Sequence, residues 1–287
     1  MRVALLGCGY AAAKHLKAIS SINGWDVVLA CDVHHDVVGI LDTYAPDCRF
    51  VREEPLFWDR CLDDVDVVAV ATPNHLHVAH ATRAMRAGCD VILEKPVALR
   101  FADVQDLIQT EGATGQRVYP VLQLRTMNTI RKCRAAISHQ HHTSRHCDIT
   151  YHVYRGDWYH QSWKGEIGCS GGILFNLGVH LFDACTYLFG DCTQVNDCRV
   201  GEQEAGGIAV YAEGSATTTV NWHISSCAKS PCRRFVVAHR EVSISGEMDA
   251  HTEQYRAFAR GERVSLLEAA KAISTCERVV HNARRWE

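Results

Sequence analysis

The sequence of 287 residues has no strong excess of charge of either sign, no Cys-x-x-Cys pair and no long apolar run. No run approaches the roughly 20 apolar residues that span a membrane. The formal net charge of -3 gives no electrostatic case for binding nucleic acid or an anionic membrane. The opening "MRVALLGCGY" lacks a cleavage-site pattern and is typical of a first strand, not of a signal peptide. These absences predict a soluble protein without a nucleic-acid or membrane partner.

Disulfides and a metal site are not favoured either. Several of the 14 cysteines, such as Cys8, Cys31 and Cys89, lie in or beside apolar runs, as reduced, buried thiols of a cytoplasmic protein do. A polar stretch at 139–147 is rich in possible ligands, but their spacing is not that of a tetrahedral site. These ligands are His139, His141, His142, His146 and Cys147. We expect no bound metal and a cytoplasmic location.

The first part of the chain alternates between strand-like and helix-like segments. The β-rich runs are 3–6, 27–31, 65–71, 91–93 and 118–122, and the helical segments between them include 11–22, 75–87 and 101–111. Apolar strands that alternate with helices are typical of a parallel sheet covered on both faces. The pattern predicts an α/β domain over 1–122.

The pattern of apolar and polar residues changes after Arg125. A helix is expected at 127–138, and alternating runs follow at 148–155, 207–214, 216–225 and 233–238, as in a mainly antiparallel sheet. An apolar helix interrupts them at 172–188, and helices at 249–260 and 266–281 end the sequence. No internal repeat or flexible linker separates the parts. The second domain, 123–287, is predicted to be α+β with an open sheet.

A glycine turn follows the first predicted strand. The segment "VALLGCGYAAAKH" places Gly7, Gly9 and Ala12 in the spacing Gly-x-Gly-x-x-Ala before a helix. The two glycines let the backbone approach a pyrophosphate at the helix N-terminus, and alanine suits close helix–strand packing. Asp32, which ends the second strand, can bind ribose hydroxyls and would repel a 2′-phosphate, so NAD is favoured over NADP. A glycine turn without a nucleotide is the alternative.

Two further strand ends carry reactive or polar side chains. In a doubly wound sheet, ligands bind at the carboxyl ends of the strands. One such end is "VAVATPNHLH", with Thr72, Asn74 and His77; the other is the triplet Glu94, Lys95 and Pro96. A buried lysine has a lowered pKa and can donate to a substrate hydroxyl. The proline, expected after a cis bond, would fix the direction of the lysine.

The apolar helix of the second domain carries a polar stripe. In "GGILFNLGVHLFD", Asn176 and His180 are four residues apart and share a helical face, which Asp183 roughly follows. Buried polar residues need partners. A single buried histidine is often structural, but its combination with a strand-end lysine favours a catalytic role.

Together, the glycine turn, "ATPNHLH", "EKP" and "GGILFNLGVHLFD" resemble the glucose–fructose oxidoreductase / inositol dehydrogenase family of nicotinamide-dependent sugar oxidoreductases. The resemblance covers essentially the whole chain. It implies a Rossmann domain followed by an α+β domain, with Lys95 and His180 flanking the reacting carbon and Glu94 near the nicotinamide ribose. Asn176 stands where the family usually has aspartate, so proton transfer falls to His180 and Lys95. The implied cofactor-binding set is Gly7, Gly9, Ala12, Asp32, Thr72, Asn74, His77, Glu94 and Gln123.

A finer resemblance concerns the substrate. The segments "VLQLR", "YRGDWYHQSWKG" and "FNLGVH" look like bacterial dehydrogenases that oxidise carbon 3 of UDP-N-acetylglucosaminuronic acid for surface polysaccharides such as O-antigen. Arginine can grip a uronate carboxylate, and aromatic rings can stack on uracil or on sugar faces. The predicted substrate-binding residues are Lys95, Arg125, Tyr151, Arg155, Trp163, Lys164, Asn176 and His180. Two departures from the resemblance are a short segment at 247–251 and the unfamiliar "SSCAKSPC".

The expected reaction places the 3-hydroxyl between Lys95 and His180. His180 accepts the proton, Lys95 orients the hydroxyl, and hydride leaves for NAD. Which side chain is the base stays open, as does whether NADH is reoxidised in place by 2-oxoglutarate. The alternatives are another sugar or inositol dehydrogenase, or a non-catalytic nucleotide-sensing regulator. The resemblance also implies a homodimer or homotetramer formed through the second domain's sheet.

Overall fold

The computed structural model describes residues 1–34, 37–61, 64–138, 144–244 and 250–285, with the side chains of Val38, Arg60 and Cys61 left aside. The chain folds into two compact units, which are described separately below. Unit 1 comprises Met1–Ala98, Ala102–Val121 and Asp249–Glu268, and unit 2 comprises Leu99–Phe101, Leu122–Met248 and Ala269–Glu287. The segment around Asp249–Glu268 thus returns to unit 1 late in the sequence.

Unit 1 contains a six-stranded sheet in the order β3-β2-β1-β4-β5-β6, with every neighbouring pair parallel. Its strands are β1 (Arg2–Leu6), β2 (Asp26–Cys31), β3 (Arg49–Val51), β4 (Val67–Val70), β5 (Asp90–Leu93) and β6 (Val118–Pro120). The four residues of β4 are all buried, as expected for a parallel strand covered on both faces. The sheet confirms the predicted α/β class.

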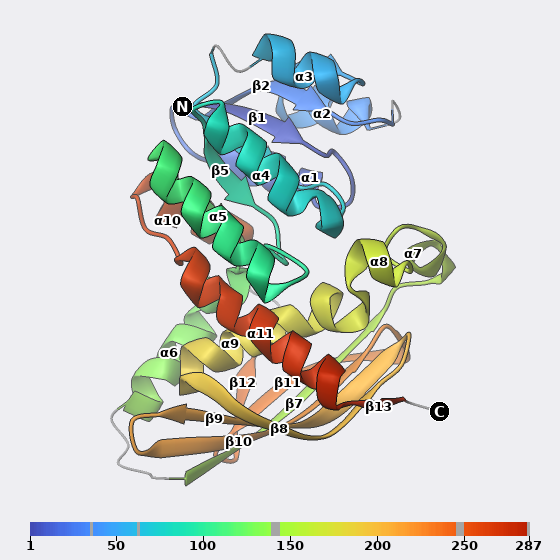
Figure 1. Cartoon of the computed structure of the whole chain (residues 1–287), viewed down its shortest axis with the longest axis vertical. Helices are drawn as coiled ribbons and strands as arrows, with labels where there is room; N and C mark the ends of the chain where they lie inside the picture. The colour runs from blue at the N-terminus through green and yellow to red at the C-terminus, as the bar shows by residue number, and fades with distance from the viewer. Residues whose placement is uncertain (35–36, 62–63, 139–143, 245–249, 286–287) are drawn as a thin grey trace. The chain divides into compact units, whose positions relative to one another are not determined.

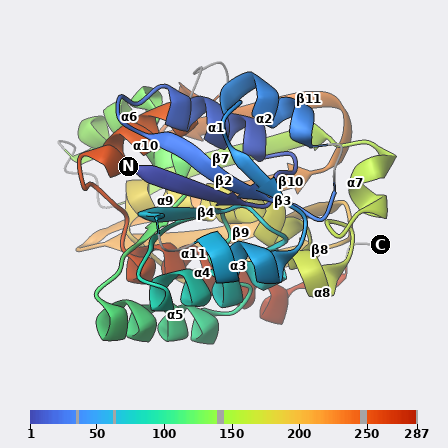
Figure 2. The same ribbon diagram turned by 90° about the horizontal axis from the view of Figure 1, so that it is seen from above.

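Helices cover both faces of this sheet (Figure 2). On one face lie α1 (Ala12–Ser20), α2 (Val38–Tyr44) and α10 (Ala250–Ala259); on the other lie α3 (Glu54–Cys61), α4 (His77–Arg86) and α5 (Phe101–Thr114). Leu16 and Ile19 of α1 share one buried cluster with Val3 and Leu5 of β1 and with Tyr255 of α10. Burial of these apolar side chains attaches α10 to the six-stranded sheet.

Unit 2 contains a seven-stranded sheet in the order β12-β11-β7-β10-β9-β8-β13. The strands are β7 (Ser144–Tyr154), β8 (Asp191–Val200), β9 (Glu204–Glu213), β10 (Ala216–Ser225), β11 (Cys227–Val237), β12 (Arg240–Ser243) and β13 (Arg284–Arg285). Two pairs, β7 with β10 and β8 with β13, are parallel, and the others are antiparallel. The sheet is mixed and mostly antiparallel, which confirms the predicted α+β class.

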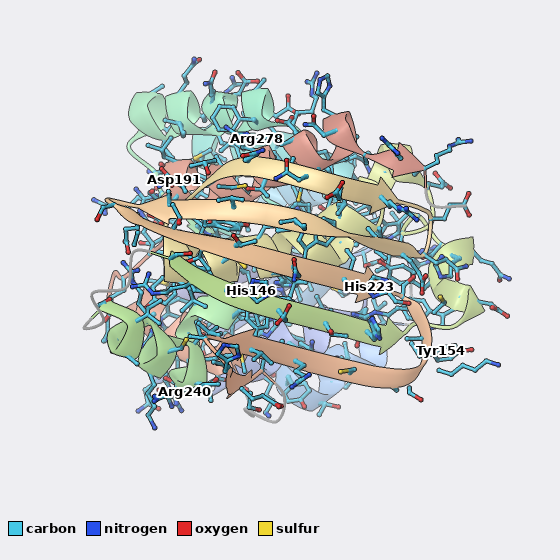
Figure 3. The ribbon with its side chains drawn as sticks, turned by 90° about the horizontal axis from the view of Figure 1, so that it is seen from below. His146, Tyr154, Asp191, His223, Arg240 and Arg278 are labelled. Carbon is cyan, nitrogen blue, oxygen red and sulfur yellow. The ribbon has the colours of Figure 1, made fainter. Side chains whose placement is uncertain are left out.

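One face of this sheet is covered by helices and the other is open. The helices α6 (Asn128–Ser138), α9 (Val179–Phe189) and α11 (Leu266–Asn282) lie on the same face (Figure 1). Figure 3 looks onto the opposite face, where His146 of β7 and His223 of β10 are labelled and where no described helix lies. Alternation along β10 explains this, because Trp222 is buried against Phe182 of α9 while its neighbour His223 points the other way.

The apolar helix predicted at 172–188 is less regular than expected. A short helix, α8 (Ile167–Ser170), precedes a π-helical segment, Leu174–Gly178, which continues into α9. The expectation that no apolar run approaches the length of a membrane span is wrong by length and composition. Residues Ile167–Phe189 are long and apolar enough by length and composition, although 83% of the apolar window is buried within the fold. Such burial is typical of a core helix.

Candidate functional site

The glycine turn joins β1 to α1 at the carboxyl end of β1. Gly7 has a φ of 92° and donates its N–H to the Cys31 carbonyl at 2.9 Å. A Cβ at Gly7 would lie 2.7 Å from the backbone of Ala71, so no other residue fits without displacing β4's end. A Cβ at Gly9 would meet nothing within 4 Å, so the space above this part of the turn is open. The first turn of α1, which begins at Ala12, carries no acidic residue, as an anion-binding helix N-terminus requires.

Asp32 lies just past the carboxyl end of β2, next to that turn. Its Oδ2 accepts the Cys8 N–H at 2.7 Å and its Oδ1 accepts the His34 N–H at 2.9 Å. The carboxylate is therefore held in place by backbone donors, and each oxygen keeps a further lone pair for a ribose hydroxyl. The open turn and the anchored carboxylate fit the diphosphate and ribose of a dinucleotide. The cofactor-binding roles of these individual residues stay predictions.

The end of β4 is tied to the end of β5 by a histidine. His77 is 1% exposed; its Nδ1 lies 2.7 Å from the Pro96 carbonyl and its Nε2 lies 2.9 Å from the Thr72 carbonyl. Burial lowers the pKa of His77, and the two carbonyl contacts oppose this shift. Because both ring nitrogens face backbone oxygens, His77 holds the two strand ends together. The cofactor contact predicted for it gains no support from this geometry.

The hydroxyl of Thr72 has its own side-chain partners. His80 Nδ1 lies 3.0 Å from Thr72 Oγ1, and His80 Nε2 lies 3.3 Å from Glu54 Oε2. Trp58 donates its Nε1–H to Glu54 Oε1 at 2.8 Å. These contacts fix the direction of the Thr72 hydroxyl at the carboxyl end of the sheet, while Asn74 beside it is 4% exposed.

Glu94 follows β5 and is held by two histidines. It is 7% exposed; its Oε1 lies 3.1 Å from His15 Nε2 and 3.6 Å from His251 Nε2. Burial alone would raise the pKa of Glu94, but hydrogen bonds and charge from His15 and His251 hold that pKa well below its usual range. Glu94 Oε2 accepts the N–H of Lys95 at 3.1 Å. The side chain of Glu94 thus belongs to the core of unit 1, and its place at the nicotinamide ribose stays a prediction.

The peptide bond between Lys95 and Pro96 is cis, as the sequence analysis expected. Pro96 is buried, whereas Lys95 is partly exposed at the carboxyl edge of the sheet. The carbonyl of Pro96 contacts His77. The backbone on both sides of Lys95 is therefore fixed by side chains from α1, α4 and α10.

In unit 2, Arg125 is paired within the fold. It lies in the 3₁₀ turn η2 (Gln123–Thr126) and its side chain is 8% exposed. Its Nε lies 2.7 Å from Asp183 Oδ2 and its Nη2 lies 2.6 Å from Asp183 Oδ1. This two-pronged pair uses the carboxylate-binding geometry of arginine on a residue of α9. The substrate-gripping role predicted for Arg125 is not favoured by this arrangement. Gln123 begins the same turn.

Asn176 and His180 lie on either side of the change from π to α geometry. Asn176 is 6% exposed and its Nδ2 donates to the Lys164 carbonyl at 3.4 Å. His180 is partly exposed on α9. The π segment has more residues per turn than an α-helix. The shared face deduced from a spacing of four in a regular helix therefore does not carry over unchanged.

A cluster of cations and aromatic rings surrounds the segment that Asn176 contacts. Lys164 Nζ lies 4.2 Å from the centre of the Trp163 ring, and Arg155 Cζ lies 5.8 Å from that of Tyr159 in α7 (Asp157–Gln161). Burial, followed by the charge of Arg155, lowers the pKa of Lys164. Such cation–ring pairs place positive charge beside flat apolar surfaces. Tyr151 of β7 has the guanidinium of Arg233 over its ring, 5.4 Å from the ring centre.

Sequence reasoning missed three residues of the Glu94 surroundings: His15, His251 and Tyr255. His15 lies three residues after Ala12 on α1, which places both on one helical face, and this spacing was the available signal. No local signal brings α10 to β5. In the described part of the chain no group of three histidine, cysteine or acidic side chains could hold a metal, and His139, His141 and His142 lie outside it.

The strand order, the glycine turn and Asp32 together define a dinucleotide-binding protein of the Rossmann type. Residues 1–121 match the model of the oxidoreductase family with an NAD-binding Rossmann fold (GFO/IDH/MocA), and residues 143–225 match the C-terminal alpha/beta domain of that family. The chain belongs to this oxidoreductase family, and its first unit is an NAD-binding domain. The family resemblance and NAD as the cofactor are thereby confirmed.

The similar proteins include one that matches this chain over its whole length. The WlbA (WbpB) dehydrogenase of Thermus thermophilus, crystallised with NAD and UDP-GlcNAcA, is 32% identical with a TM-score of 0.91, covering 100% of this chain and 96% of that one. A second structure of it contains NAD and alpha-ketoglutarate. Inositol 2-dehydrogenase of Salmonella typhimurium is 30% identical over 127 residues, 42% of this chain and 36% of its own length. A 2,7-anhydro-N-acetylneuraminate hydratase of Mediterraneibacter gnavus is 27% identical over 192 residues, 49% of its length. The match thus spans only about a third to a half of these two curated relatives.

Proposed function

We propose that this chain is an NAD-dependent sugar dehydrogenase that oxidises the 3-hydroxyl of a UDP-N-acetylglucosaminuronic acid-type nucleotide sugar to a ketone. The observation that carries the proposal is the similarity, over the whole of this chain, to the Thermus thermophilus dehydrogenase crystallised with NAD and UDP-GlcNAcA. The cationic and aromatic segment around Lys164 adds independent support, because this substrate carries a uronate carboxylate, a diphosphate and a uracil ring.

NAD, when bound, accepts the hydride from carbon 3. The glycine turn and the N-terminus of α1 would hold its diphosphate, and Asp32 would accept hydrogen bonds from its ribose. Thr72, Asn74 and Gln123 complete the proposed cofactor contacts. We assign His77 to holding the strand ends, because both its ring nitrogens face carbonyls of unit 1.

Lys95 and His180 handle the proton of the reacting hydroxyl. We assign the base to His180, because imidazole titrates near neutrality and is partly exposed here. Lys95 donates to the hydroxyl oxygen and stabilises its developing negative charge. Asn176, a neutral amide, cannot accept the proton, and we assign it to orienting the substrate together with the Lys164 backbone that it contacts.

Arg155, Lys164 and Trp163 are the proposed contacts to the acidic part of the substrate. Both cations lie against aromatic rings, which restricts their side chains and places positive charge beside flat apolar surfaces. Tyr151, which lies on β7, is proposed to contribute a further aromatic ring to the substrate contacts. Arg125 is assigned to supporting α9, because its guanidinium is already bound to Asp183.

The proposed substrate indicates the biosynthetic route to which the reaction belongs. A 3-keto nucleotide sugar is an intermediate for amination, so we place the reaction in the cytoplasmic synthesis of bacterial surface polysaccharide. We also propose a homodimer or homotetramer formed through the open face of the seven-stranded sheet. Light scattering on the purified chain tests the assembly, and a monomer at micromolar concentration would contradict it.

The experiment compares substrates at fixed NAD. The panel is UDP-N-acetylglucosaminuronic acid, UDP-N-acetylglucosamine (which lacks the carboxylate), myo-inositol and glucose, each with and without 2-oxoglutarate. The proposal expects NADH formation or 3-keto product with the first compound and a kcat/KM at least about tenfold lower with the second, the value of one lost charge-assisted contact. Turnover with inositol or glucose alone would keep a dehydrogenase of the family and remove the nucleotide sugar. Tight NAD binding without any turnover would favour a sensor.

A further inference from the structure

A buried polar cluster in unit 1 has no role in the mechanism described so far. It consists of His15 on α1, Glu94 after β5, and His251 and Tyr255 on α10. His15 and Tyr255 are 0% exposed, Glu94 is 7% exposed and His251 is 8% exposed. Ionisable groups buried to this degree are costly unless they are paired. The cluster joins three elements that are far apart in the sequence.

The direction of its hydrogen bonds can be worked out. His15 Nδ1 lies 2.6 Å from the Tyr255 hydroxyl oxygen, and His15 Nε2 lies 3.1 Å from Glu94 Oε1. A carboxylate only accepts, so His15 Nε2 carries the proton of that bond. Burial, followed by the charge of Glu94, raises the pKa of Tyr255, so its phenol stays protonated and donates to Nδ1. The order is therefore Tyr255 to His15 to Glu94.

The carboxylate is held at its other end as well. Glu94 Oε2 accepts the Lys95 N–H at 3.1 Å, while His251 Nε2 lies 3.6 Å from Oε1 and its ring meets the His15 ring edge-on. One oxygen of Glu94 thus faces imidazoles and the other faces the backbone of Lys95. The chain of bonds ends at Tyr255, whose ring is fully buried against Trp25 and Phe258. A dead end inside the core suits holding a residue in place and not carrying protons to solvent.

We propose that His15, His251 and Tyr255 are positioning residues, which keep Glu94 ionised and hold it against the amide of Lys95, and so fix the backbone from which the Lys95 side chain extends. The inference rests on the proposed function in one respect, the assignment of Lys95 to catalysis. Through this cluster, α10 becomes part of the support for the Glu94–Lys95–Pro96 turn.

Opposing effects on the pKa of Glu94 explain why it needs these partners. Burial pushes its pKa up, and the partners His15 and His251 push it down by more. Other charged groups also act here: His77 and Lys95 on the side of the strand ends, and Lys14 beside His251. Removing one imidazole shifts the balance toward burial, which favours the neutral acid. A neutral Glu94 would accept a weaker hydrogen bond from the Lys95 amide.

The test uses the full chain and measures Glu94 directly. The titration midpoint of its side-chain carboxyl is followed by carbon NMR in wild type, His15→Gln and His251→Gln, with Glu94→Gln to assign the signal. We expect the midpoint to rise by about one pH unit in either histidine variant, because each variant loses a hydrogen bond that favours the charged form of Glu94. His223→Gln, which removes a hydrogen-bonded histidine of unit 2, is the control and should leave the midpoint unchanged.

A second readout separates positioning from mere packing. In the histidine variants the acidic limb of the kcat profile should move to higher pH, while KM for NAD stays within about threefold. In a Glu94→Gln background the same His15→Gln change should have no further effect on the profile, as a double-mutant cycle requires. If His15→Gln does not fold, Tyr255→Phe removes only the hydroxyl and should still raise the midpoint.

The outcomes are distinguishable from those for the proposed function. An unchanged Glu94 midpoint in both histidine variants, or a lower melting temperature with an unmoved pH profile, would overturn the positioning role. A chain without turnover on any sugar would remove the proposed function, while the carboxyl titration would still decide how Glu94 is held.

Discussion

Arg125 and Asp183 form a two-pronged ion pair inside unit 2, with Nη2 of the arginine 2.6 Å from Oδ1 of the aspartate. The pair attaches the η2 turn to α9 at a position three residues after His180. Both side chains are almost fully buried, at 8% and 1% exposed. Because Asp183 lies on α9, the pair also restricts the position of this helix, which carries the proposed base His180.

Breaking this pair should destabilise the chain strongly. Asp183→Ala leaves the Arg125 guanidinium buried without its partner, which costs about 3–5 kcal/mol in similar cases. Replacing both residues by apolar ones, as in Arg125→Met with Asp183→Leu, should recover most of that loss because no charge stays buried. The free energy of unfolding in denaturant measures both effects. A double variant no more stable than Asp183→Ala would contradict this account.

The two glycines of the turn should respond differently to alanine. At Gly7 the backbone has a φ of 92° and the new Cβ would meet the Ala71 backbone, so Gly7→Ala should lower stability by roughly 1–3 kcal/mol. At Gly9 the Cβ meets nothing, so Gly9→Ala should keep its melting temperature but weaken NAD binding about tenfold or more. Calorimetry of unfolding and of NAD binding separates the two. Equal melting temperatures for both variants would refute the packing at Gly7.

Stability should fall on the acid side of neutrality. Burial lowers the pKa of His77, His80 and His251, so the folded chain keeps them neutral while the unfolded chain protonates them near pH 6.5. Their contribution is fully present above that pH and is lost as pH falls below it. Each contributes a slope of up to about 1.4 kcal/mol per pH unit. Glu94, with its lowered pKa, adds a loss in a more acidic range.

The measurement is the melting temperature between pH 8 and pH 5, with His251→Gln as the comparison. We expect a plateau above neutrality, a decline below about pH 6.5, and a shallower decline in the variant. A rise in melting temperature on acidification would mean that these histidines gain protons on folding, the opposite of what their burial implies.

Lys95 and His180 should be needed for turnover and not for cofactor binding. Lys95→Ala and His180→Ala are each expected to lower kcat by about 10²–10⁴-fold, the range for a lost acid–base group. NAD affinity, measured by calorimetry, should stay within about threefold. If His180 is the base, its variant loses the limb near neutrality that an imidazole gives, and the lysine variant keeps it. That limb is distinct from the more acidic one set by Glu94. Near-normal turnover in both variants would remove the assignment.

Local patterns were enough to predict most of unit 1. The apolar runs at β1, β4 and β5 and the glycine turn follow from spacing alone, because parallel strands buried on both faces are continuously apolar. The three-residue strand β3 was missed, since Arg49–Val51 is too short to show a period. The helices α2 and α3 beside it were missed for the same lack of a clear apolar face.

Features that depend on tertiary contacts could not be predicted in this way. The packing of α10 on α1 depends on Tyr255 and Phe258 joining a cluster more than 200 residues earlier in the chain, which no local period encodes. Likewise, the triplet Glu94, Lys95 and Pro96 was noticed because its chemistry is unusual at a strand end. Its partners His15 and His251 could not be named without coordinates. The parallel pairing of β7 with β10 could not be predicted from alternating apolar and polar residues alone.

The most direct test of the central claim is a single-turnover reaction with enzyme and NAD in excess over UDP-N-acetylglucosaminuronic acid, analysed by mass spectrometry. It needs no release of NADH, so a tightly held reduced cofactor cannot hide the chemistry. The account predicts that the sugar is converted to a product lighter by two hydrogens and oxidised at carbon 3, and that Lys95→Ala leaves it unchanged. A sugar of unaltered mass after incubation with NAD-loaded wild-type protein would contradict it.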